Sequence, residues 1–301
     1  MDEGVDGDQG VTARSSMTAS ASFSRYLHRH PRTRLGLLLA APVTWLVLAY
    51  LGSLAALFLT ALYKTDPFTS DIVKTVGGQN FSELVKTGVY RVITVRTIGV
   101  ALAVTLLDLC LALPMAIFMA KVAKPRLRNL LVVAVLMPLW ASYLVKGYAW
   151  RAIFDSGSGV LKSTVGASPG FGLVATTVTL AYLWLPYMVM PIFAGLDRLP
   201  NSLLEASSDL GAHGHRTMRS VVMPLLLPSM VAGSIFTFSL TLGDYITVKI
   251  VGGKSQMIGN VVFDNFGSSN IPFAAAFALV PVAIMVAYLL TARRTGAFEN
   301  L

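Results

Sequence analysis

The sequence predicts an all-α membrane protein with six transmembrane helices, and three observations support this fold class. Of the 301 residues, 54% are hydrophobic and only 13% are charged, and the mean hydropathy is +0.66. Average soluble domains carry about 25% charged residues. The apolar residues gather in six runs, each reaching the roughly 20 residues that cross ~30 Å of hydrocarbon. Since such spans meet no water, they must be helices, and the alternating pattern of outer-membrane strands is absent.

The chain begins with a segment, residues 1–30, that is rich in Gly, Ser, Ala and Asp and has no hydrophobic period. This composition predicts a disordered tail. A basic collar then precedes the first apolar run and comprises Arg25, His28, Arg29, His30, Arg32 and Arg34. The run at 35–63 is too long for the apolar region of a signal peptide and lacks a clear small-residue cleavage site. We therefore expect a first membrane helix that is retained.

The predicted transmembrane domain covers residues 31–295, and a short tail follows at 296–301. Its spans are placed at about 35–63, 92–120, 130–153, 173–196, 225–248 and 273–292. Several spans contain proline, which removes a backbone donor and kinks a helix: Pro42, Pro114, Pro138, Pro186, Pro191 and Pro281. Bundles tolerate such kinks because neighbouring helices satisfy the freed carbonyls.

Lys and Arg predict the orientation. With both termini in the cytoplasm, 14 of the 24 Lys and Arg residues fall on the inner side, in tight clusters beside helix ends. The acids Asp66, Asp71, Glu83, Asp155 and Asp264 then fall outside. We therefore expect a multi-pass protein of a bacterial cytoplasmic membrane with both termini inside.

Composition and spacing argue against several other functions. The net charge of +9 is explained by basic cytoplasmic loops, so nucleic acid is not an expected partner. Cys110 is the only cysteine, and the histidine pairs lack further ligands, so no metal site is expected. Gly252-Gly253-Lys254-Ser255 lacks the earlier glycine of a phosphate-binding loop and is predicted to be a glycine turn. With no catalytic cluster in the spans, we expect no enzymatic activity and no bound cofactor.

The polar insert at 197–224 is the largest charged segment in the second half of the chain. Ser202 and Glu205 have the spacing of a capping box, and Gly211 suits the left-handed position that ends a helix. Leu203, Ala206, Ser207 and Leu210 share one predicted face. A second, basic helix is expected from about His213 to Val222, with Pro224 as its stop. On these residues alone, a partner-docking helix-turn-helix and an amphipathic loop on lipid headgroups both remain open.

This insert resembles the cytoplasmic signature of permease subunits in binding-protein-dependent ABC importers. That signature reads Glu-Ala-Ala, three residues, Gly, nine residues, Ile, one residue, Leu-Pro, and it matches in register Glu205, Ala206, Ser207, Gly211, Val221, Met223 and Pro224. In that family the loop forms a coupling helix that docks on an ATP-hydrolysing subunit. The resemblance therefore implies an ATPase-docking loop comprising Glu205, Ala206, Ser207, Asp209, Gly211, His213, Arg216 and Pro224.

The resemblance extends over about 35–295 and is nearest to the spermidine/putrescine branch. It rests there on Met137-Pro138-Leu139-Trp140, on the segment Trp184–Pro191, on Gly252-Gly253, and on Ile258-Gly259-Asn260-Val261. It implies the type I importer permease fold. It also implies a second permease subunit, two ATP-binding subunits that hold ATP and Mg, and an extracytoplasmic substrate-binding protein. This chain would itself bind no cofactor.

Candidate pathway residues are acids within spans and aromatic residues near the predicted outer ends: Asp108, Trp140, Tyr143, Tyr148, Trp184, Tyr187, Asp244 and Tyr245. Acids within spans mark pathways or internal pairs, so a structural role for Asp108 stays open. Aromatic faces beside an acid suit an organic cation, although interfacial aromatic belts also explain many of these residues.

Polyamine is the expected cargo, with alternatives. Lys146, Arg151 and Lys249 lie in the same outer regions and would repel a polycation if they faced the pathway. Amino-acid-like compounds, phosphonates and iron chelates therefore remain alternative cargoes. An ion-coupled secondary transporter that uses Asp108 is a further alternative, against which the lack of an evident inverted repeat argues.

Overall fold

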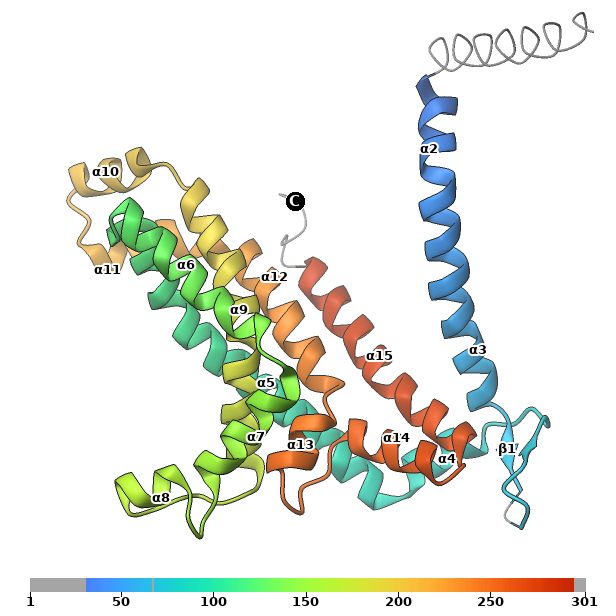
Figure 1. Ribbon diagram of the computed structural model, residues 1–301. Coiled ribbons are helices and arrows are strands. Elements are labelled where there is room, and N and C mark those ends of the chain that lie inside the picture. The colour runs from blue at the N-terminus through green and yellow to red at the C-terminus, as the bar shows by residue number, and fades with distance from the viewer. Residues whose placement is uncertain (1–30, 67, 295–301) are drawn as a thin grey trace, which may run out of the picture. The chain divides into compact units, whose positions relative to one another are not determined.

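The computed structural model describes residues 31–66 and 68–294, so the predicted tails at 1–30 and 296–301 lie outside the described residues. Nearly all regular structure in the described part is helical, which confirms the predicted fold class (Figure 1). The described residues fall into two units, 31–59 and 60–294.

The first unit contains one long apolar helical segment. It consists of α2 (Pro31–Leu46), the π-helical turn η1 (Val47–Leu51) and most of α3 (Gly52–Ala61). The stretch Leu38–Ala61 has 24 residues, which is long enough to cross a bilayer. This stretch lies within the predicted first span, 35–63. The helix continues past Pro42.

The second unit begins with a two-stranded antiparallel hairpin, in which Lys64 pairs with Val73 and Thr65 with Ile72. Its elements in order are β1 (Lys64–Thr65), β2 (Ile72–Val73), α4 (Gln79–Lys86), α5 (Gly88–Ile117), η2 (Phe118–Val122), α6 (Pro125–Trp140), α7 (Tyr143–Phe154), α8 (Val160–Val165), α9 (Leu173–Arg198), α10 (Asn201–Asp209), α11 (Gly214–Thr217), η3 (Met218–Val222), α12 (Met223–Leu242), α13 (Ile246–Val251), α14 (Ile258–Gly267) and α15 (Ile271–Arg294).

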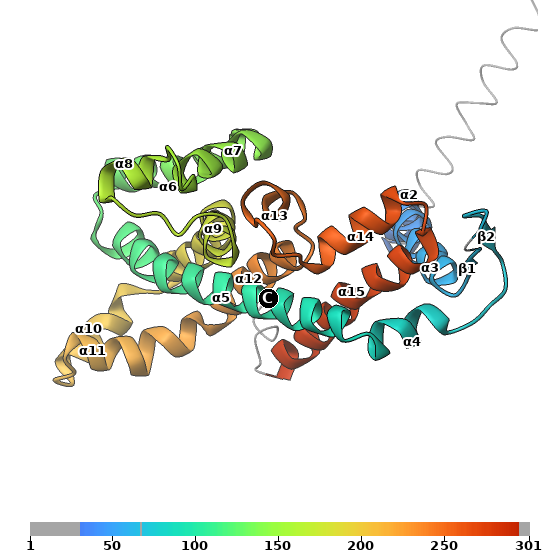
Figure 2. The same cartoon turned by 90° about the horizontal axis from the view of Figure 1, so that it is seen from below.

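Helices α5, α9 and α12 form the core of this unit and lie side by side in both views (Figures 1 and 2). Their largest shared cluster includes Ala112 of α5, Met188 and Ile192 of α9, and Leu226 of α12. The small alanines let α5 approach its neighbours closely. Helix α15 packs on α12 and α14, while α6 and α7 lie against α9.

The candidate membrane spans differ in form from the predicted ones. Five helices in the described residues are long and apolar enough to cross a bilayer, and the pair α6 and α7 makes a sixth crossing if it is one broken span. The prediction of a continuous helix at 130–153 is wrong, because α6 and α7 meet at 94°. Ala141 and Ser142 are extended between them. The Pro138 carbonyl near the end of α6 accepts hydrogen bonds from the Lys146 ammonium (3.0 Å) and from the Ala141 N–H (3.3 Å).

The predicted fifth span, 225–248, also has different ends. Helix α12 stops at Leu242, and a separate short helix, α13, follows after Asp244. At its other end the helix is continuous from Gly214, so the prediction that Pro224 stops a separate basic helix is wrong. The π-helical turn η3 explains the continuity, because the Met223 N–H donates five residues back to the Met218 carbonyl just before the proline.

Two glycines set the distance between α9 and α12. A Cβ atom on Gly233 would lie 2.8 Å from the Met188 sulfur and 3.1 Å from the Met188 Cα. A Cβ atom on Gly195 would lie 2.3 Å from the Ser229 hydroxyl oxygen. Both distances are shorter than normal contacts, so the two helices approach this closely only because these positions lack side chains.

Replacing Gly233 with alanine should therefore loosen the core. We expect Gly233→Ala to lower the melting temperature of the purified protein, since overpacking a tight contact costs roughly 1–3 kcal/mol. Gly99→Ala on α5 is the matched control, because a Cβ atom there meets nothing within 4 Å. That control should be neutral or slightly stabilising. Equal melting temperatures for the two variants would contradict the tight contact.

Candidate functional site

Two polar clusters of the second unit are joined by the continuous helix Gly214–Leu242, which includes α11, η3 and α12. At 29 residues it is about 43 Å long, since each residue rises 1.5 Å. The hairpin formed by α10 and α11 lies at one end, and α13 lies at the other (Figure 1). We call the first cluster the coupling hairpin (residues 199–217), after the role that the sequence resemblance implies for it. We call the second the acid–aromatic cluster (Tyr143, Trp184, Tyr187, Asp244 and Thr247).

The coupling hairpin begins directly where α9 ends. Gly211 has φ +75°, so the prediction of a left-handed helix stop is confirmed. The predicted capping box of Ser202 and Glu205 is not formed, because α10 begins at Asn201 and Pro200 occupies the cap position without a side-chain hydrogen bond. The fixed φ of proline starts the helix earlier than the box would.

The two faces of α10 differ in exposure. Leu204 and Ser207 turn towards the protein, and Leu204 packs against the α5–α9–α12 core. Leu203, Ala206 and Leu210 face outwards, with Leu210 88% exposed. Ser207 was expected to share this outer face and instead lies inside. The outer face is therefore apolar, uncovered and flanked by the exposed carboxylates of Glu205 and Asp209.

The two arms of the hairpin are tied by a pair of hydroxyl groups. Ser207 and Thr217 lie 2.8 Å apart through their side-chain oxygens, and Ser207 is buried. The side chains of the remaining predicted loop residues, His213 and Arg216, are exposed. The Ser207–Thr217 contact thus holds the two arms together on the inner side of the hairpin. The charged side chains on its outer side are exposed and accessible to another surface.

Basic residues from distant segments gather at the same end of the unit. Arg128 of α6 forms an ion pair with Asp197 of α9 (2.7 Å) and lies over the Phe193 ring at 5.1 Å. Because both charged groups are partly exposed, this pair contributes little stability. Lys121 of η2 contacts the junction of α9 and α10. Two of the basic clusters used in the orientation prediction, residues 121–128 and the loop around Glu205, therefore lie together.

The acid–aromatic cluster is built around Asp244, which is 8% exposed. Its carboxylate accepts hydrogen bonds from the Tyr143 hydroxyl, from the Thr247 backbone N–H (2.9 Å) and from the Thr247 hydroxyl (3.3 Å). The Tyr143 and Thr247 hydroxyl oxygens lie 2.6 Å apart, so the two hydroxyl protons are shared among these contacts. The breaks between α6 and α7 and between α12 and α13 bring these groups together from positions 101 residues apart.

Aromatic rings continue from this acid along α9. The ring centroids of Tyr143 and Trp184 are 5.9 Å apart, and those of Trp184 and Tyr187 are 6.0 Å apart. Tyr187 then approaches Phe236 of α12 at 6.3 Å. Trp184 and Tyr187 lie near the middle of α9, whereas the sequence pattern predicts them near an outer end of the span.

A cavity of about 280 Å³ opens beside this cluster and is lined by Trp184, Ser239, Leu240, Gly243, Asp244, Tyr245 and Ile246. A carboxylate beside an indole face can attract an organic cation by charge and by the ring quadrupole. The arrangement therefore fits a small positively charged molecule better than an anion.

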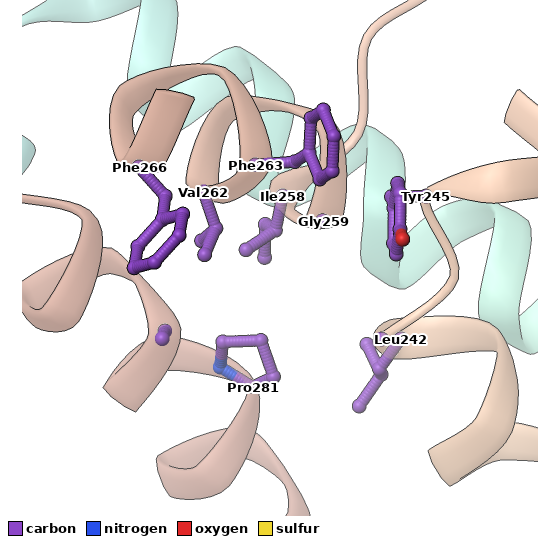
Figure 3. A pocket seen from close by; sticks show the side chains of 10 residues that line it. Leu242, Tyr245, Ile258, Gly259, Val262, Phe263, Phe266 and Pro281 are labelled. Carbon is purple, nitrogen blue, oxygen red and sulfur yellow. The ribbon is translucent and has the colours of Figure 1, made fainter. Parts of the chain in front are cut away.

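A second cavity of about 360 Å³ shares Gly243 and Tyr245 with the first. Figure 3 shows Ile258, Val262 and Phe266 of α14 on one side and Pro281 of α15 and Leu242 of α12 on the other. Tyr245 stacks on Phe263, with centroids 4.7 Å apart and 17° between the planes. The lining of this cavity is almost wholly apolar.

Three predicted pathway residues, Asp108, Trp140 and Tyr148, are not among the residues that line the 280 Å³ cavity. Asp108 is 0% exposed, and neither carboxylate oxygen has a hydrogen-bond partner among the described residues. Trp140 is 86% exposed at the end of α6, and Tyr148 is exposed on α7. Asp108 thus belongs to the packed side of α5.

Thr247, Phe236 and Phe263 are site residues that the sequence pattern did not predict. Thr247 follows Asp244 by three residues, which is a helix-capping spacing that could have indicated both the break and the partner. The two phenylalanines carry no comparable signal, because their ring partners, Tyr187 and Tyr245, lie on other elements of the structure.

The basic residues near the acid–aromatic cluster are bonded to other groups of the chain. Lys249 pairs with Asp264 (2.9 Å) and lies 3.9 Å from the Phe263 ring centroid. Arg151 donates to the Ile250 carbonyl (2.5 Å) and lies over the Phe171 ring. Lys146 bonds to α6, as described above. None of these three is among the described residues that line the 280 Å³ cavity.

The segment Gly252–Ser255 is a turn, as predicted. Gly253 has φ +58°, and the Ser255 N–H donates to the Gly252 carbonyl at 3.0 Å. It follows the six-residue helix α13 instead of joining a strand to a helix, as a phosphate-binding loop does.

Comparison with known proteins agrees with this architecture. Residues 112–294 match the family described as "Binding-protein-dependent transport system inner membrane component". The chain is 39% identical over 297 residues to the inner membrane ABC transporter permease protein YdcU of Escherichia coli (strain K12), covering 92% of this chain and 95% of the relative. It is 31% identical over 269 residues to the spermidine/putrescine transport system permease protein PotB of Salmonella typhimurium (strain SL1344), covering 86% and 92%.

A solved bacterial alginate ABC transporter, in complex with an alginate-bound periplasmic protein, contains a chain of similar fold. Its TM-score is 0.66 at 12% identity, with 89% of this chain and 94% of that chain covered. At this identity the likeness concerns the fold alone.

The hydroxyl pair of the coupling hairpin can be tested by a double-mutant cycle. Ser207→Ala leaves the Thr217 hydroxyl without its partner. We expect the free energy of unfolding to fall by about 1 kcal/mol and hydrogen exchange in residues 201–217 to become faster. Thr217→Val should cost a similar amount. The double variant should lose less than the sum of the two single changes. Strictly additive losses would show that the two hydroxyl groups do not interact.

Proposed function

Because the chain belongs to the family of binding-protein-dependent transport system inner membrane components and is a permease subunit of an ABC importer, we propose that it forms half of a translocation pathway for a small organic cation. The proposed cargo is a polyamine such as putrescine or spermidine. The chain is a multi-pass protein of the inner membrane with the type I permease fold. A second permease subunit completes the proposed pathway, and a binding protein delivers the cargo from outside.

The observation that carries the coupling role is the uncovered apolar face of α10. Leu203, Ala206 and Leu210 are exposed on a helix that is held firmly from its other side. Apolar faces rimmed by charged groups are typical of protein interfaces. We infer that a separate ATPase, which holds the ATP and Mg, docks on this face. Glu205, Asp209, His213 and Arg216 would form the charged rim.

The proposed docking sets the orientation. The coupling hairpin must lie in the cytoplasm to meet ATP-driven subunits, and this agrees with the basic residues that gather at its end. The acid–aromatic cluster then lies deeper in the membrane on the path from outside. Both termini are proposed to be cytoplasmic.

The observation that carries the cargo proposal is the position of Asp244 beside Trp184 at an open cavity. A polyamine offers ammonium groups to the carboxylate and the ring face, and methylene groups to the apolar walls. The ion pair of Lys249 with Asp264 and the carbonyl contacts of Arg151 and Lys146 reduce the repulsion that these cations would exert. The similarity to a spermidine/putrescine permease supports the same choice.

The docking face can be tested by placing a charge in its centre. Leu210→Asp should strongly reduce the amount of ATPase that co-purifies with the permease, because a carboxylate would be buried without a partner. Val165→Asp on α8 is the control, since it makes the same kind of change at an exposed position at the opposite end of the unit.

Glu205→Ala and Gly211→Val extend this test within the same hairpin. Gly211→Val should distort the helix stop, because a β-branched residue is strained at φ +75°. Unchanged ATPase association and unchanged uptake in all three hairpin variants would remove the proposed coupling role.

The cargo proposal predicts that Asp244→Asn weakens transport of putrescine. We expect KM for uptake into proteoliposomes to rise roughly tenfold, which corresponds to about 1.4 kcal/mol of lost charge interaction. Asp71→Asn, which removes the same charge from an exposed hairpin, should leave KM unchanged. Ligand identification on the cognate binding protein provides the complementary measurement. A binding protein that ignores putrescine and spermidine but holds an anionic or neutral solute would refute polyamine as the cargo.

A further inference from the structure

The junction between α9 and α10 is held by a lysine from a different helix. The Lys121 ammonium donates to the Leu199 carbonyl at 2.7 Å and to the Asn201 side-chain oxygen at 3.1 Å. Leu199 is the residue at which α9 ends, and Asn201 is the first residue of α10. Lys121 lies in η2, at the end of α5, 78 residues earlier in the chain. One side chain therefore links the ends of three helices.

The Leu199 carbonyl is one of the acceptors that the end of a helix leaves without an intrahelical partner. A cation at a helix C-terminus also interacts favourably with the helix dipole. The contact is consequently directional and specific to the place where the chain turns from α9 into the coupling hairpin.

The packing of the hairpin shows why this link matters. A cavity of about 240 Å³ lies between the hairpin and the ends of α5 and α9, and its lining includes Lys121, Leu199, Leu204 and Thr217. Apolar contact with the core is provided by Leu204, Met218 and Val222. The hairpin thus has room to tilt towards α5, and Lys121 spans the two sides of that space.

We propose that Lys121 is a positioning residue for energy coupling: it fixes α5 to the α9–α10 junction so that displacement of a docked α10 moves α5 and α9 together. Helix α9 carries Trp184 and Tyr187, and α5 packs along α9 and α12. A displacement of the hairpin is thereby transmitted along α9 to the acid–aromatic cluster. This proposal rests on the docking role proposed above and assigns to Lys121 the transmission that follows docking.

Transmission can be measured without knowing the cargo. The full complex with its ATPase and partner permease carries Cys110→Ser, which removes the only cysteine of this chain, and Ser239→Cys, which places a thiol on the wall of the 280 Å³ cavity. The rate at which a membrane-impermeant maleimide labels this thiol is compared with and without ATP. In the parent complex we expect ATP to change this rate by roughly fivefold or more, a typical coupling factor between linked sites.

Lys121→Met should reduce the response of the labelling rate to ATP to nearly none, while the ATPase still co-purifies and still hydrolyses ATP. Lys121→Arg should restore the response, because guanidinium can donate to the same two acceptors. Lys124→Met is the matched control. It removes the same charge three residues later, where the side chain is exposed, and should leave the response intact. If Lys121→Met is not recovered as an assembled complex, Asn201→Ala should reduce the response and Asn201→Asp should keep it.

Three outcomes overturn the proposal. A full ATP response in an assembled Lys121→Met complex would show that the link transmits nothing, and an equal loss in Lys124→Met would reduce the effect to surface charge. Loss of ATPase co-purification in Lys121→Met would place the residue in docking instead. A parent complex that shows no response to ATP would count against the proposed function itself, which separates that failure from a failure specific to Lys121.

Discussion

The close contact between α9 and α12 is the constraint on which the rest of the second unit depends. Gly195 and Gly233 let the two helices meet at a distance that any side chain would prevent, and α5 fills the groove beside them. Both candidate site clusters pack against the core formed by α5, α9 and α12. The coupling hairpin rests on it through Leu204, the adjoining turn η3 through Val222, and the acid–aromatic cluster through Trp184. A change at one end can therefore reach the other through packed helices, because tightly packed interiors transmit displacement instead of absorbing it.

The two breaks in the helices have a common physical basis. Irregular backbone at membrane depth is stable only where other groups satisfy its hydrogen bonds. At the break after α6, the Lys146 ammonium bonds to the Pro138 carbonyl, and at the break after α12, the Asp244 carboxylate accepts the Thr247 N–H. The same breaks bring the Tyr143 side chain into contact with Asp244. The candidate cargo site thus exists because two spans are interrupted, and the polar groups that permit the interruptions also supply part of its chemistry.

Some charged side chains are bonded to other groups of this chain, and others are left without an opposite charge from this chain. Lys249, Arg151 and Lys146 are bonded to a carboxylate or to carbonyl groups of this chain. Asp244 is hydrogen-bonded to neutral donors, so its negative charge is not cancelled by a neighbouring cation. At the other end, the charged groups of α10 and α11 are exposed around an apolar face. This division supports a cation in the membrane and a protein partner at the hairpin.

The sequence by itself determined the composition-driven features: a helical membrane protein, the approximate position of the apolar spans, the basic clusters, the stop at Gly211 and the in-register signature from Glu205 to Pro224. These depend on hydropathy, charge and local backbone preference, which act over a few turns. Only the tertiary structure decided that 130–153 is bent, that the helix runs through Pro224, that Ser207 lies inside and that Lys121 reaches Leu199. Hydropathy averages over a window and carries no direction, so a break between two apolar segments leaves it unchanged. Which partner a polar side chain reaches depends on residues that lie close in space and far apart in the chain.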